Sequence, residues 1–265
     1  MAAQPEAERD FSFPVVRSGI SPMAPWRWVS RGLDDLKWCP SASLFFGGCF
    51  AAMGLVLNTV FARHYEYTSA LVCGFLLVAP FFAIGLYEIS RRRTLGASCE
   101  LRPTLAAWRT NAGNIGLYSL ILTVVFLVWA RASLITFALF YTSALPTLDD
   151  FVKQVVSFQN IEFLVAYVCV GLLFAILVFA FSVVSIPLML DRDQDAVTAM
   201  IASFLALVRN PLAMAVWALV IVGFTVIGFA TLYIGLVFAM PVVGHATWHA
   251  YQELVEPRPL PGRAA

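Results

Sequence analysis

Four long apolar runs dominate the chain, and the longest extends from Pro211 to Gly244 without an Asp, Glu, Lys or Arg residue. A single helix over this run would measure about 51 Å, whereas the hydrocarbon core of a bilayer is about 30 Å thick. The run therefore predicts a tight helical hairpin, with one strongly tilted helix as the alternative. Because a soluble fold of this size cannot bury four such runs, the pattern predicts a membrane protein.

The same pattern predicts an all-α membrane protein with about six transmembrane helices. They cover residues 42–61, 69–89, 112–130, 163–190, 212–228 and 232–249. The third helix could continue past Arg131 to about residue 141, and the turn between the last two is expected at 229–231. The polar flanks predict a disordered cytoplasmic arm, a polytopic helical membrane domain and a cytoplasmic tail. Their bounds are 1–22, 23–252 and 253–265.

The distribution of charge along the chain predicts its orientation in the membrane. The chain is 60% hydrophobic and 12% charged, with a net charge of +1, so no basic field points to a nucleic-acid partner. With six spans, all 17 Lys and Arg residues except Arg63, Arg131 and Lys153 fall on the side of the two termini. The positive-inside rule places that side in the cytoplasm. With five spans, only the two arginines of the C-terminal tail change sides, so five spans remain an alternative.

A short semi-apolar segment precedes each odd span, which predicts three interfacial helices and a possible threefold internal repeat. The segments cover residues 26–37, 101–108 and 196–208. A basic residue ends or directly follows each segment, namely Lys37, Arg109 and Arg209, and a proline or asparagine comes within three residues of it. In the first segment, helical spacing places Trp26 and Leu33 on an apolar face and Asp35 on the polar face.

Two groups of residues are expected at the lipid headgroups. Trp26 and Trp28 would anchor the first interfacial helix at that depth. The basic cluster Arg91, Arg92 and Arg93 would fix the topology and contact anionic headgroups. The lipid bilayer is therefore the first partner that the sequence implies.

Glu88 and Arg131 are candidates for ion pairs within the membrane. Glu88 lies one turn before the arginine cluster, so an i,i+3 or i,i+4 pair is expected at the inner interface. Arg131 reaches the outer headgroups if its helix ends there, but it needs a partner in the bundle if the helix continues. The nearest acidic residues in sequence are Asp149, Asp150 and Glu162.

The best constellation for a metal or a haem is the pair His245 and His249. A spacing of four places both imidazoles on one helical face. A mixed site could be completed by the three carboxylates that follow the fourth span on the same side, Asp191, Asp193 and Asp195. The alternatives are an interfacial aromatic belt for the histidines and an acidic helix cap for the aspartates. We expect no cofactor. The alternative is that His245 and His249 bind a haem or a metal.

The five cysteines form no C-x-x-C pair, and three of them lie inside apolar runs. We therefore expect them to be small buried hydrophobic residues rather than metal ligands or disulfide partners.

Three blocks of the chain resemble the bacterial integral membrane proteins catalogued as domain of unknown function 2189. They are PFFAIGLYEISRR at 80–92, SIPLMLDR at 185–192 and GHATWH at 244–249. The resemblance covers roughly residues 25–255 and implies an integral membrane fold. The family has no assigned chemistry, so the resemblance implies no catalytic residue and no substrate.

No nucleophile–base pair, phosphate loop or carboxylate dyad stands at a workable spacing, which argues against an enzyme. The near absence of charge within the spans favours a structural or accessory role, in which the protein associates with lipid, with itself or with another membrane complex. A transporter or channel for an uncharged or lipid-like solute is the alternative. A metal- or haem-binding membrane protein is the third hypothesis.

Overall fold

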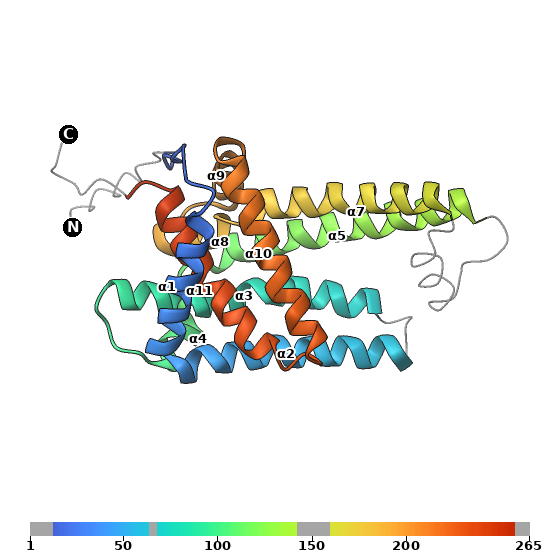
Figure 1. Ribbon diagram of the computed structural model, residues 1–265. Coiled ribbons are helices and arrows are strands. Elements are labelled where there is room, and N and C mark those ends of the chain that lie inside the picture. Colours follow the sequence, from blue (N-terminus) through green and yellow to red (C-terminus); the bar gives the residue numbers. More distant parts are fainter. Residues whose placement is uncertain (1–12, 64–67, 142–159, 258–265) are drawn as a thin grey trace, which may run out of the picture.

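The computed structural model describes residues 13–63, 68–141 and 160–257, and they form an all-α membrane fold (Figure 1). Four long helices run along one direction: α2 (Pro40–Arg63), α3 (Thr68–Thr94), α5 (Ala112–Phe140) and α7 (Ile161–Ser182). At one end they are joined by α1 (Ala24–Trp38), α4 (Leu101–Ala106), the 3₁₀ helix η2 (Ala107–Asn111), α8 (Ser185–Arg192) and α9 (Ala196–Arg209). We call this the interfacial end. The last two helices are α10 (Pro211–Ala230) and α11 (Leu236–Leu254).

Within the described residues, five segments are long and apolar enough to cross a bilayer. They are Pro40–Arg63, Leu71–Thr94, Leu101–Phe140, Ile161–Arg192 and Pro211–Ala230. The predicted all-α, multi-pass membrane protein is thereby confirmed. α11 is not among these segments, so the count of six spans stays a prediction. Short helices precede α2, α5 and α10 at the expected places, while the internal repeat also stays a prediction.

α5 takes the longer of the two courses that the sequence left open. It continues past Arg131 to Phe140, and Arg131 is exposed. Arg131 lies about 28 Å along α5, close to the full thickness of the hydrocarbon core, so its side chain can reach the far headgroups. Among the described residues, Glu162 included, Arg131 has no ion-pair partner, while Asp149 and Asp150 lie outside the described residues.

The fourth predicted span, 163–190, is divided in two. α7 ends at Ser182, and α8 begins at Ser185 after a two-residue turn. Pro187 supplies the physical reason, because it has no N–H group to donate and its ring clashes with the carbonyl four residues earlier. α8 buries the whole stretch 185–190 at the interfacial end.

The run from Pro211 to Gly244 folds as a helical hairpin, as predicted. The break falls at 231–235, slightly later than the expected turn. Figure 1 shows α10 crossing the long helices diagonally and α11 returning to the interfacial end.

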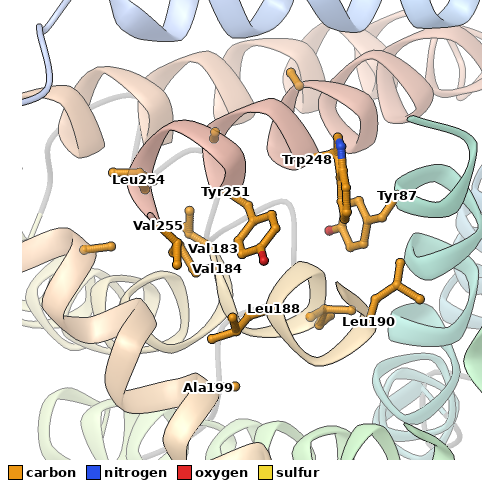
Figure 2. Close-up of a cluster of buried hydrophobic side chains, with 14 of the residues drawn as sticks. Tyr87, Val183, Val184, Leu188, Leu190, Ala199, Trp248, Tyr251, Leu254 and Val255 are labelled. Atoms are coloured by element: carbon orange, nitrogen blue, oxygen red, sulfur yellow. The ribbon is translucent and has the colours of Figure 1, made fainter. Parts of the chain in front are cut away.

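α11 forms the centre of the molecule, since it contacts α1, α2, α3 and α10. Close approach to α2 depends on Gly47, where a Cβ atom would overlap the carbonyl oxygen of Val237. On another face, Trp248 and Tyr251 pack against α8 in a buried apolar cluster that also includes Tyr87 of α3 (Figure 2). The interfacial end therefore carries the main core of the protein.

Both ends of the described chain are fixed to this core. Val16 forms an antiparallel bridge with Val255, and Arg17 N donates to the carbonyl oxygen of Leu254 at 2.8 Å. The side chain of Asn210, between α9 and α10, accepts a hydrogen bond from Ile20 N at 2.9 Å. The disorder expected for residues 1–22 therefore does not extend to this part of the arm.

Cys39 and Cys99 form a disulfide that joins the α1–α2 corner to the loop before α4. This corrects the expectation that every cysteine is only a small buried residue. The two positions are 60 residues apart in the sequence, and no local motif shows that the corner and the loop meet. Cys49, Cys73 and Cys169 are free.

Candidate functional site

A buried carboxylate, that of Asp35 on α1, connects three helices at the interfacial end. Its side chain is 2% exposed, Oδ1 accepts a hydrogen bond from Arg93 Nη1 of α3 at 2.7 Å, and Oδ2 lies 2.8 Å from His249 Nε2 of α11. Both carboxylate oxygens are thus held by donors, and the carboxylate itself is almost wholly buried. We call Asp35, Arg93 and His249 the Asp35 network.

The electrostatics of the network favour the ionised carboxylate. Burial alone would raise the pKa of Asp35, because the charged form loses its hydration. Hydrogen bonds from His249, Ser90 and Arg93, together with the charge of His249, outweigh burial and hold the pKa below its ordinary value. Asp35 is therefore an anion at neutral pH and compensates the guanidinium of Arg93.

A cavity of about 280 Å³ opens beside the Asp35 network. It is lined by Arg31, Asp34, Asp35, Arg93, Thr94 and His249. Two guanidinium groups and two carboxylates share its wall, which suits a small polar group that carries both signs of charge. The Thr94 hydroxyl in this wall donates to the carbonyl oxygen of Ser90 at 3.0 Å.

His245, one turn before His249, is fully buried, with both ring nitrogens engaged. Nε2 lies 2.9 Å from Ser43 Oγ of α2, and Nδ1 lies 2.8 Å from Ser90 Oγ of α3. The Ser43 hydroxyl also donates to the carbonyl oxygen of Cys39 at 2.7 Å. A hydroxyl beside an imidazole can form part of a nucleophilic site, but here both side chains are 0% exposed. The contacts therefore hold α2, α3 and α11 together.

The structure does not bring the three aspartates to these histidines. Asp191 Oδ2 accepts a hydrogen bond from Tyr251 Oη at 2.6 Å, and Asp193 is the left-handed residue that ends α8. Asp195 Oδ1 accepts from Thr198 N at 2.9 Å and caps α9, which is the role that the sequence offered as an alternative. Within the described ranges, no three His, Cys, Asp or Glu side chains are grouped so that they could hold a metal.

The buried face of α1 differs from the expected one. Trp28 is fully buried, its Nε1 donates to Glu253 Oε2 at 2.9 Å, and its ring packs edge-on against Trp217. Trp26 is instead 54% exposed. Only Trp26 is therefore free to lie at headgroup depth.

Close helix packing explains this rotation of α1. A Cβ atom on Gly32 would lie 2.8 Å from the carbonyl oxygen of Val242, so α1 and α11 approach through that glycine. The same approach turns Asp35 inward, where Arg93 and His249 compensate it. Sequence spacing identified the helix but could not show that a charged residue had partners on its inner side.

The arginine cluster is mostly engaged within the protein. Arg91 Nε donates to Glu88 Oε2 at 2.7 Å, which is the i,i+3 ion pair expected from the sequence. Arg92 Nε donates to the carbonyl oxygen of Ser98 at 3.1 Å, and Arg93 belongs to the Asp35 network. Contact of this cluster with lipid headgroups stays a prediction.

Fold and site together define a multi-pass integral membrane protein with a polar centre at one end. The family described as "Predicted integral membrane protein (DUF2189)" matches residues 68–191 of the chain. Of the three blocks that carried the resemblance, 80–92 lies inside the match and 185–192 reaches its end, whereas 244–249 lies beyond it. No curated protein and no solved structure matches the chain.

Proposed function

We propose that the protein is a structural or accessory component of the bacterial inner membrane, acting through contacts with lipid and with itself or another membrane complex. One observation carries this proposal. In the part of the chain that the structure describes, the buried carboxylates Asp35 and Glu88 each have a cationic partner from the same chain. These buried charges are thus compensated within the chain, which suits a rigid structural element better than a reaction centre.

The surface left for contacts is apolar. Only 17% of the most apolar stretch in the α5 segment and 11% of that in the α7 segment is buried. An apolar groove of about 300 Å³ between the two helices is lined by residues such as Phe126, Trp129 and Phe174. Such surfaces pack against lipid chains or neighbouring helices, because neither demands polar groups.

α2 offers a test of assembly. A Cβ atom on Gly48 would have no neighbour within 4 Å, and Ala52, one turn on, is exposed. Small residues four apart let helices of neighbouring proteins approach closely. We expect cross-linking in native membranes to trap the protein in a complex, and Gly48→Leu to reduce that complex several-fold.

Gly223→Leu is the matched control, since Gly223 also has open space around it but is flanked by Leu219 and Ile227 rather than by small residues. The folded fraction of each variant is measured by size-exclusion chromatography. A protein that remains uncross-linked in its membrane and purifies alone in mild detergent contradicts the proposed role.

We further propose that the interfacial end and both termini face the cytoplasm. Cytoplasmic reductants keep thiols reduced, whereas disulfides persist in oxidising compartments. We therefore expect Cys39 and Cys99 to be thiols when cells are lysed into an alkylating reagent, and to form their disulfide after oxidation of the purified protein. Mass spectrometry of the alkylated peptides gives the result. A disulfide already present at lysis places this end, and both termini, on the periplasmic side.

A further inference from the structure

We infer that the α10–α11 hairpin is re-entrant: it enters the bilayer from the interfacial end, turns inside the hydrocarbon core and leaves on the same side. The partner of its tip is the acyl chains of the bilayer. The inference concerns how deeply the hairpin enters the bilayer, and it stands whether or not the protein assembles with other protein chains.

Contacts with α2 give the depth of the tip. A Cβ atom on Gly54 would lie 2.8 Å from the ring of Tyr233, in the turn of the hairpin. Gly54 precedes Arg63, the far end of α2, by about 14 Å of helix. The turn therefore ends well short of the level that α2 reaches, and a spanning α2 places it within the hydrocarbon core of about 30 Å.

The side chains of the tip are those of a lipid-facing surface. Leu232 is 76% exposed, Ile234 is 67% exposed and Phe229 is 50% exposed. Leu232 and Tyr233 adopt left-handed backbone conformations with φ of 54° and 69°, where turns in water normally have glycine or asparagine. An exposed turn with large apolar residues at these positions is suited to hydrocarbon.

The backbone N–H groups of the turn are all paired within the hairpin. Each N–H from 231 to 239 donates to an oxygen within the hairpin, and the Gly235 N–H donates to Thr231 Oγ1 at 2.9 Å. The Thr231 hydroxyl in turn contacts the carbonyl oxygens of Ile227 and Gly228. Pairing these N–H groups lowers the cost of placing non-helical backbone at membrane depth, since hydrocarbon offers them no partner.

Both bases of the hairpin are fixed at the interfacial end. α10 begins after Asn210, whose Nδ2 donates to the carbonyl oxygen of Arg17 at 2.8 Å. α11 ends with Glu253, which accepts a hydrogen bond from Arg27 at 2.6 Å, and with the bridge between Val255 and Val16. The start and the end of the hairpin therefore lie on one side of the membrane.

Single cysteines test the inference in the full-length protein in membrane vesicles. In a background with the three free cysteines changed to alanine, Ile234→Cys probes the tip. Ser18→Cys probes the side of the interfacial end, and Ala62→Cys probes the far end of α2. Each is treated with a membrane-impermeant maleimide in right-side-out and in inside-out vesicles, and the labelling of the background is subtracted.

We expect Ser18→Cys and Ala62→Cys to be labelled from opposite sides and Ile234→Cys from neither. A nitroxide at position 234 should collide more often with oxygen than with a water-soluble nickel complex. Labelling of the tip from the side of Ala62 shows a full transmembrane hairpin, and labelling from the side of Ser18 shows a surface hairpin; either overturns the inference. Phe229→Cys repeats the measurement if Ile234→Cys does not fold.

Discussion

Replacing Asp35 with alanine is expected to lower the free energy of unfolding by about 3 kcal/mol, because Arg93 and His249 lose the buried carboxylate that compensates them. The side chain of Arg93 is 38% exposed, so solvent relieves part of the cost and the loss lies at the lower end for broken buried pairs. Titration of the purified protein from mild detergent into SDS, followed by tryptophan fluorescence, measures the change.

Asp34 provides the control. It is the neighbouring residue, its side chain is 56% exposed, and its contact with Lys37 is 3.9 Å long. Asp34→Ala should change the free energy of unfolding by less than about 0.5 kcal/mol. Equal losses in the two variants would show that burial of the Asp35 charge has no special role.

Lowering the pH should destabilise the protein by protonating the carboxylate of Asp35. The pKa of Asp35 is lowered in the folded protein, so its contribution is fully present above the pKa of an unfolded aspartate, about 3.9. The contribution is lost as the pH falls through the lower folded value. Wild-type protein should therefore lose more stability below about pH 4 than Asp35→Asn does. If the free energy of unfolding depends on pH in the same way in the two proteins, the ionised carboxylate of Asp35 does not stabilise the fold.

Gly47→Ala is expected to be the second severe substitution. The new Cβ atom would overlap the carbonyl oxygen of Val237, and backbone atoms cannot rotate away as a flexible side chain can. α2 and α11 must then separate, at a cost of about 1–3 kcal/mol. The same SDS titration measures the loss, and limited proteolysis should show cleavage of a loosened α11.

Gly48, the adjacent glycine, provides the control for Gly47→Ala. Gly48→Ala adds the same methyl group one residue later, where nothing lies within 4 Å, so we expect it to be neutral or slightly stabilising. If both alanine variants unfold at the same SDS fraction as wild type, α2 and α11 do not pack through Gly47.

Hydrophobic patterning predicted the elements better than their packing. Long apolar runs are a property of local sequence, so the long helices, the short helices that precede α2, α5 and α10, and the hairpin were foreseeable. The division of the fourth span before Pro187 was visible only as an isolated proline, which a helix sometimes tolerates. The burial of Trp28 depended on which side of α1 faces α11, and local spacing does not determine that.

The polar centre could not be read from the sequence for the same reason. Asp35 and His249 stand 214 residues apart, and Ser43 and His245 stand 202 apart, so no motif joins them. The pair of histidines at a spacing of four was recognisable, whereas the serine hydroxyls and the carboxylate that engage the two rings come from three other helices. Only the chain fold shows that these side chains are already engaged with one another.

A hairpin that enters and leaves on one side would make the described part of the protein conical. At the interfacial end, one leaflet must accommodate α1, α9, α10 and α11 besides the long helices, whereas the described part of the opposite end consists of α2 with α3 and α5 with α7 (Figure 1). Lipids around such a cone relax by bending, with the crowded leaflet on the convex side. Many copies in one patch would therefore generate curvature and would gather where the bilayer already bulges toward the chain termini.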